Sequence, residues 1–135
     1  TWETIQKTIL INFGSFEKLF ITTNNDYLKL KETIQIKYKS GFPYLSGPKI
    51  FNYWSFIMST YGGIKLKNRE YIEIAPDTHI TQCSIKLGII NKSDSENKLL
   101  ISQKWRELLN NTGIDPIDMH APLWFWSKNG FIYEP

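Results

Sequence analysis

The stretch that decides the fold reads LSGPK at residues 45–49 and continues as IFNYWSFIMST to residue 60. Gly47 gives the backbone the freedom that a tight turn needs, and Pro48 suits the first position of a helix, where its missing N–H is not required. Gly62-Gly63 then stops the pattern. We therefore predict a short turn that opens directly into a helix from Pro48 to about Thr60.

This helix carries large side chains on two faces, so its core face has to be chosen. At helical spacing, one broad face is apolar and the other is mixed. We expect the core face to hold Ile50, Trp54, Ile57 and Met58, and the second face to hold Lys49, Asn52, Tyr53 and Phe56.

The flanking sequence predicts further short helices on both sides of this one. Apolar spacing, capping residues and glycine stops place them at residues 4–10, from Ser15 to Phe20, from Asn25 or Asp26 to about Ser40-Gly41, from Asp77 to Leu87, at residues 99–110 and at residues 118–126. Residues 71–74 alternate as an extended segment, which is too short for a sheet and suits a connector or a small ribbon. The sequence thus predicts an all-α, compact multi-helix domain.

Composition limits the class of protein. At 135 residues, with 41% hydrophobic and 15% aromatic residues, the chain suits one folded domain over residues 1–135. Cys83 is its only cysteine, which excludes an internal disulfide and a four-cysteine zinc or iron–sulfur site, and with two histidines we expect no metal. A net charge of +3 is compatible with a polyanionic partner but does not imply one. No apolar run could span a bilayer, so we expect a soluble intracellular protein of the cytoplasm or nucleoid.

The turn before Pro48 has the features of an anion site. A turn that opens into a helix directs several unpaired amides to one place, where they can hold a phosphate. Lys49 lies in the first turn, where the helix dipole and partial desolvation favour the neutral amine, which can act as a nucleophile. Asp77 starts another helix, where the dipole favours its ionised carboxylate. If the fold joins them, the two side chains form an acid–base pair.

The order of these features resembles a known family. LSGPK at residues 45–49, then an apolar helix, then PDTHI at residues 76–80 ahead of another helix, is similar to the helix-hairpin-helix DNA glycosylases. Residues 12–19, NFGSFEKL, resemble the helix that precedes the hairpin in that family, so residues 5 to 90 are covered. The resemblance is to N-glycosylase/DNA lyases, of the 8-oxoguanine glycosylase or endonuclease III type, without the iron–sulfur cluster.

The resemblance implies a function and a set of residues. In the family, the lysine attacks the sugar C1′ of a flipped-out nucleotide and forms a Schiff base, and the aspartate stabilises the positive charge on the sugar. Lys49 and Asp77 hold these positions. The partner would be double-stranded DNA with a damaged base, such as an oxidised purine, and no cofactor is needed. The remaining site residues would be Leu45, Ser46 and Gly47 for DNA binding, and Asn52, Tyr53 and His79 for the base pocket.

Other interpretations of the same residues stay open. Lys49 also fits a solvated surface lysine, Asp77 a helix cap alone, and Asn52 and Tyr53 ordinary packing or solvent positions. The aromatic segment at residues 123–126 suits either core packing or stacking on unpaired bases. The chain could thus be a non-catalytic helix-hairpin-helix DNA-binding module or a helical protein-interaction domain. The family's usual upstream helices are missing, so we expect an N-terminally truncated member.

Overall fold

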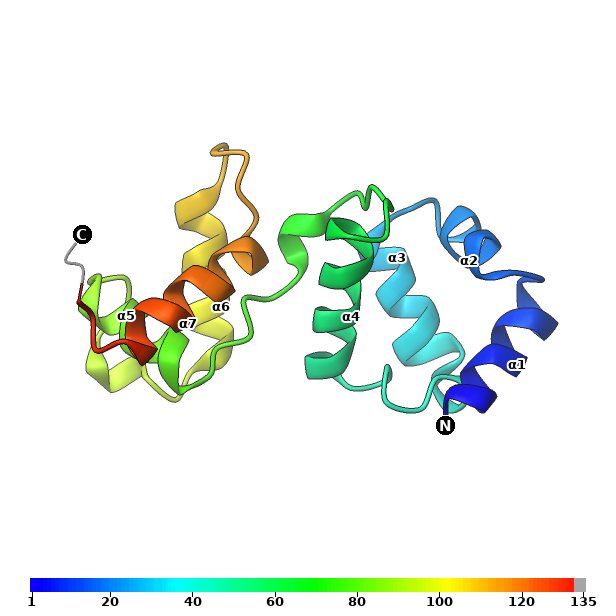
Figure 1. Ribbon diagram of the computed structural model, residues 1–135, viewed down its shortest axis with the longest axis horizontal. Coiled ribbons are helices and arrows are strands. Elements are labelled where there is room, and N and C mark those ends of the chain that lie inside the picture. The colour runs from blue at the N-terminus through cyan, green and yellow to red at the C-terminus, as the bar shows by residue number, and fades with distance from the viewer. Residues whose placement is uncertain (133–135) are drawn as a thin grey trace. The chain divides into compact units, whose positions relative to one another are not determined.

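The computed structural model describes residues 1–132, which form seven α-helices and no strand (Figure 1). The all-α class is therefore confirmed. The chain forms two compact units, residues 1–69 and residues 70–135, each with its own core. One domain over residues 1–135 stays a prediction. None of the helices in the described residues is long and apolar enough to cross a membrane.

Unit 1 is built from four α-helices whose starts are set by local sequence. Thr1, Ser15 and Asp26 each accept a hydrogen bond from a first-turn amide with their side chains, as capping residues do. The elements are α1 (Trp2–Asn12), α2 (Phe16–Thr22), α3 (Tyr27–Glu32), the π-helical η1 (Thr33–Lys37), the 3-10 turn η2 (Lys39–Gly41) and α4 (Pro48–Thr60). The bounds predicted for α4 are thus confirmed.

The third helix differs from the expected continuous helix to Ser40-Gly41. Regular α-helix ends at Glu32, and the next turn widens, so that the amide of Tyr38 bonds to the carbonyl of Thr33 at 2.9 Å. Tyr27, Leu30 and Ile34, which share one face by helical spacing, are buried. The apolar spacing located the buried face but not the change in helical pitch.

The core of unit 1 is aromatic. Phe20 stacks on Trp54 with ring centroids 5.8 Å apart, and Tyr27 stacks on Phe51 at 5.6 Å. Each such pair adds about 0.5–1.5 kcal/mol to the free energy of burying the rings. These pairs connect α2, α3 and α4 into one packed group.

The core face of α4 is only partly the expected one, since Trp54 packs in the aromatic core as assigned. Ile50, assigned to the core, is 47% exposed, whereas Phe51, Asn52 and Ser55 are buried. Asn52 was expected on the solvent face with Lys49, and this expectation is wrong, because the hydroxyl of Tyr27 donates a 2.6 Å hydrogen bond to its Oδ1. A partner on another helix therefore sets the rotation of α4.

Unit 2 begins near the short 3-10 turn η3 (Arg69–Tyr71) and continues as an irregular connector rather than a ribbon, with Ile72 and Ile74 buried. Its elements are α5 (Thr78–Lys86), the 3-10 turn η4 (Lys92–Asp94), α6 (Lys98–Leu109), the 3-10 turn η5 (Pro116–Met119) and α7 (His120–Lys128). Ile80, Cys83, Ile101, Trp105 and Leu123 are among the core residues that join α5, α6 and α7.

Two polar contacts fix the helices of unit 2 to one another. The Cys83 thiol donates to the carbonyl of Leu123 at 3.2 Å, which attaches α5 to α7. The indole N–H of Trp105 donates to Ser84 Oγ at 2.8 Å, which attaches α6 to α5. The prediction that the C-terminal aromatic segment packs back on the protein is confirmed for Leu123 and Trp126, which contact this core.

Candidate functional site

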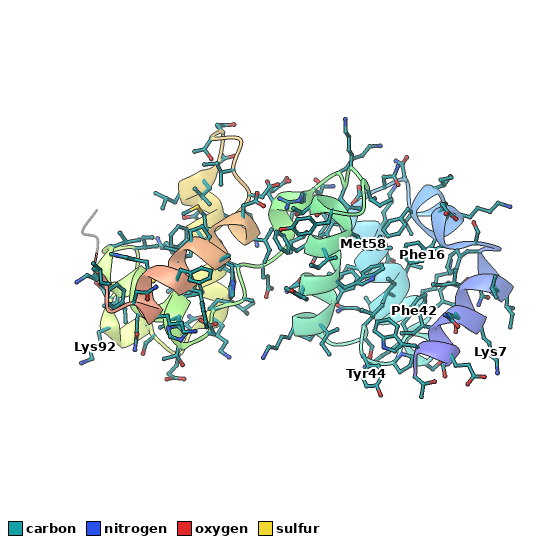
Figure 2. All side chains as sticks on the ribbon, viewed as in Figure 1. Lys7, Phe16, Phe42, Tyr44, Met58 and Lys92 are labelled. Atoms are coloured by element: carbon teal, nitrogen blue, oxygen red, sulfur yellow. The ribbon has the colours of Figure 1, made fainter. Side chains whose placement is uncertain are left out.

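The turn before α4 is anchored in unit 1 by its apolar side chains. Phe42 and Leu45 are buried, whereas Tyr44 is exposed at a φ of 72° (Figure 2). The amide of Ser46 bonds to the carbonyl of Phe42 at 3.1 Å, which closes the turn. Leu45 therefore serves as a core anchor, and its side chain is not at the surface where a DNA contact was expected.

The start of α4 is open to an external acceptor. Gly47 occupies the cap position in extended conformation, and no side chain bonds to the first-turn amides, in contrast to the caps of α1, α2, α3, α5 and α6. Helix geometry leaves those amides without an intrahelical partner. Ser46 and Gly47 lie beside them, half-buried. The local geometry is thus compatible with the predicted phosphate contact.

Lys49 is exposed in the first turn of α4. Burial within unit 1 therefore does not supply the desolvation that was expected to favour its neutral form. Tyr53 lies four residues further along the same helix, is 64% exposed, and packs its ring near Phe56 with centroids 6.4 Å apart. Lys49 and Tyr53 therefore lie on an accessible side of α4. Asn52 is buried and does not lie on that side.

Asp77 is the cap of α5 in unit 2. Its Oδ1 accepts a 2.9 Å hydrogen bond from the amide of Ile80, as predicted for a residue at this position. The second oxygen, Oδ2, lies 3.6 Å from Nε2 of His120, the first residue of α7, and both side chains are partly exposed. This distance is too long for a hydrogen bond but allows an ion pair when the imidazole is protonated.

His79 is held against α7 by a short chain of polar groups. Its Nδ1 lies 3.0 Å from Ser127 Oγ, and that hydroxyl donates to Gln82 Oε1 at 3.2 Å. Because Ser127 uses its single proton on Gln82, it accepts from His79, which assigns the ring proton to Nδ1. The edge of Trp124 packs on the ring at a centroid distance of 5.3 Å.

Asp77 also lines a surface groove of about 580 Å³ over one side of α5. Thr78, Thr81 and Gln82 line it with polar side chains, Lys92 of η4 contributes one cation, and Lys98, the first residue of α6, contributes another. Glu96 adds one carboxylate. The groove therefore offers both hydrogen-bond donors and hydrogen-bond acceptors in addition to the Asp77 carboxylate.

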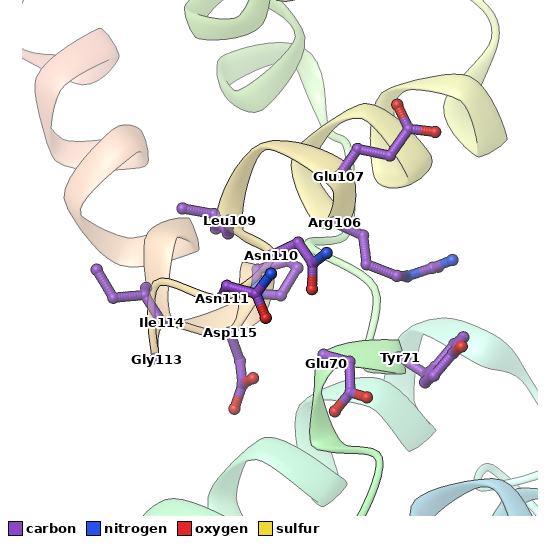
Figure 3. Close-up of a pocket in the computed structure, with 11 residues that line it drawn as sticks. Glu70, Tyr71, Arg106, Glu107, Leu109, Asn110, Asn111, Gly113, Ile114 and Asp115 are labelled. Carbon is purple, nitrogen blue, oxygen red and sulfur yellow. The ribbon is translucent and has the colours of Figure 1, made fainter.

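A second cavity of about 420 Å³ is lined by residues 70–71, by the end of α6 and by the segment that follows it, and none of the predicted site residues lines it (Figure 3). The Arg106 guanidinium lies over the ring of Tyr71 at 4.7 Å, and Glu70, Glu107 and Asp115 line the walls. Because its acidic side chains outnumber its single arginine, this cavity does not suit an anionic ligand such as DNA.

The structure brings the predicted residues together in two groups. Leu45 to Lys49 and Tyr53 surround the start of α4 in unit 1, and Asp77 and His79 lie at the start of α5 in unit 2. The pairing of Lys49 with Asp77 stays a prediction. Comparison with known protein families, curated proteins and solved structures finds no match for this chain.

Sequence reasoning missed the residues of α7 that contact the start of α5. His120, Ser127 and the α5 residue Gln82 all touch the Asp77 and His79 region, but they were not predicted as site residues. A polar histidine at the start of an apolar helix was the only available signal. Such a residue indicates a role only when the packing partner of its helix is known.

Proposed function

We propose that this protein is a DNA N-glycosylase and apurinic-site lyase that removes a damaged base from double-stranded DNA. The observation that carries the proposal is the position of Lys49, an exposed primary amine in the first turn of α4, directly after an uncapped hairpin turn. The free amides next to Gly47 suit a DNA phosphate. A strand held there would bring its sugar near the lysine.

The reaction needs only the lysine and a carboxylate. The amine of Lys49 gives up a proton to solvent and attacks C1′, the bond from C1′ to the base breaks, and the base leaves with the electron pair and takes up a proton. Opening of the sugar ring then gives an imine between Lys49 and C1′. Loss of a C2′ proton expels the 3′ phosphate, and hydrolysis of the imine releases the enzyme.

Asp77 is proposed to stabilise the positive charge that develops on the sugar. Its Oδ1 accepts a hydrogen bond from the amide of Ile80, which orients the carboxylate at the start of α5. Tyr53, exposed on α4, and His79, in contact with Trp124, are the proposed base-pocket residues. Asn52 is buried and its Oδ1 already accepts from Tyr27, so its side chain is not accessible to a base. We therefore assign it a role in the core of unit 1.

Borohydride trapping tests the proposal directly. The full chain is mixed with duplexes that carry an abasic site or one of several oxidised bases, and borohydride reduces the imine to a stable amine that links protein to DNA. We expect a covalent adduct with the wild-type protein and none with Lys49→Ala. Lys39→Ala, which removes another exposed lysine of unit 1, is the matched control and should form the adduct normally.

A second variant separates catalysis from simple DNA binding. The uncapped start of α4 beside an exposed cation also suits a non-catalytic module in which Lys49 pairs only with phosphate. Lys49→Arg keeps the charge but removes the primary amine. If this variant binds DNA like the wild type and loses the adduct, the lyase is supported. Binding by both proteins with no adduct on any duplex favours the module, and absence of salt-sensitive binding favours a protein-interaction domain.

A further inference from the structure

The two oxygens of the Asp77 carboxylate have different surroundings within unit 2. Oδ1 is held by the amide of Ile80 at 2.9 Å, and this contact is explained by helix capping. Oδ2 faces Nε2 of His120 at 3.6 Å. The second contact has no capping role, because His120 belongs to α7 and lies far from Asp77 in the sequence.

The packing of α7 keeps His120 at this place. Leu123 is buried and its carbonyl accepts from the thiol of Cys83 on α5. Ser127, one helical turn further on, joins His79 and Gln82 of α5. Before α7, Asp115 and Asp118 form a reciprocal cap on η5, which fixes the chain as it enters the helix. The first residue of α7 is thus set against the first turn of α5 by contacts on both sides.

The exposure of the pair indicates that it is accessible to a substrate. The side chain of His120 is 33% exposed and that of Asp77 is 44% exposed, so neither is a buried structural group. Asp77 also lines the groove over α5, where Lys92, Lys98 and Glu96 are the other charged groups. An ion pair that only stabilised the fold at such exposure would contribute little.

We propose that His120 is a positioning residue that acts through Asp77 and holds its second oxygen in one orientation during base excision. This inference rests on the proposed glycosylase function. With Oδ1 fixed by Ile80 and Oδ2 faced by His120, the carboxylate cannot rotate freely about its side-chain bonds. A fixed carboxylate stabilises a developing charge better than a mobile one, because its reorganisation is completed before the reaction.

Single-turnover excision kinetics of the full-length protein test this role. On a duplex with one oxidised base, we expect His120→Ala to slow the chemical step about fivefold, the scale of a partly exposed ion pair, with unchanged affinity for DNA. His120→Lys retains a cation that can face Oδ2 and should restore most of the rate. Ala121→Gln, at the next and exposed position of α7, is the matched control and should react like the wild type.

The outcomes separate the two proposals. Excision by the wild type together with an unchanged or faster rate in His120→Ala would overturn the role of His120 and leave the glycosylase function standing. A slow His120→Ala that His120→Lys does not restore, or that has lost DNA affinity, would also overturn it, because structural damage explains both results. Absence of excision and of borohydride adduct in the wild type would overturn the proposed function itself.

Discussion

Removal of the Ser84 hydroxyl, a single atom group, is expected to destabilise unit 2 strongly. Ser84 is fully buried on α5, where its Oγ donates to the carbonyl of Ile80 at 2.7 Å and accepts from the indole N–H of Trp105 at 2.8 Å. In Ser84→Ala the carbonyl keeps its helical bond, but the indole N–H loses its acceptor. Because Trp105 is only 2% exposed, water does not easily replace that acceptor.

The expected cost follows from the unpaired donor. A buried donor that loses its partner costs about 1–3 kcal/mol. Taking ~2 kcal/mol, and a Tm shift of roughly 4–8 °C per kcal/mol for a small domain, we expect Ser84→Ala to lower the Tm of unit 2 by about 10 °C. Thermal unfolding followed by circular dichroism measures the Tm, and in urea unfolding the denaturant midpoint should fall while the slope stays constant.

Ser102 provides a matched control in the same unit. It is buried on α6, and its Oγ has no hydrogen-bond partner among the described residues. Ser102→Ala deletes the same atom without orphaning a donor, so it should be neutral or slightly stabilising. Equal destabilisation by both substitutions would refute the reasoning. So would a full effect of Ser84→Ala in a Trp105→Phe background, where the donor is already gone.

Three further predictions concern titratable groups. Asp77→Ala should cost about 1 kcal/mol of stability, whereas Asp77→Asn should keep the cap and lose only lyase activity, as thermal melts and trapping would show. Burial raises the pKa of the Cys83 thiol, so a thiol reagent should modify it only after unfolding, and stability should fall as the pH rises past the ordinary value of a thiol, which ionises first in the unfolded chain. Burial acts to raise the pKa of Asp26, but hydrogen bonds from Asn68 and two backbone amides outweigh it and hold the pKa below its usual range. The stability from Asp26 should therefore be present at neutral pH and lost as the pH falls below about 5, and Asp26→Asn should flatten that loss in acid-unfolding curves.

Helix starts were predictable because their signals are local. The short side chains of Ser15, Asp26 and Asp77 accept hydrogen bonds from first-turn amides. Pro48 begins α4 at the predicted residue. Each signal depends on residues within one turn of the cap, so no knowledge of the tertiary fold is needed. The change of pitch in η1 has no such local signal, and it was missed.

Contacts between helices were not predictable in the same way. The hydrogen bond from Tyr27 to Asn52 joins residues 25 positions apart, and the approach of His120 to Asp77 depends on how α7 packs on α5. Both contacts place a polar side chain where its own helix gives no reason for it. Sequence spacing describes one helix at a time, whereas these positions depend on two.

The contrast between α4 and α5 shows when spacing does locate a site. In α5, the polar side chains leave one stripe that can be buried, and Ile80, Cys83 and Ser84 lie in it, whereas Leu87, which follows the helix, is exposed. The first turn of α5 therefore had only one orientation, with Asp77 as its cap and His79 in contact with Ser127 of α7. In α4, large apolar residues occur on every side, so the spacing allowed several rotations, and Asn52 rather than Ile50 took the buried position. A base-pocket assignment on an aromatic helix such as α4 therefore needs a measured contact, whereas one on α5 can begin from the sequence.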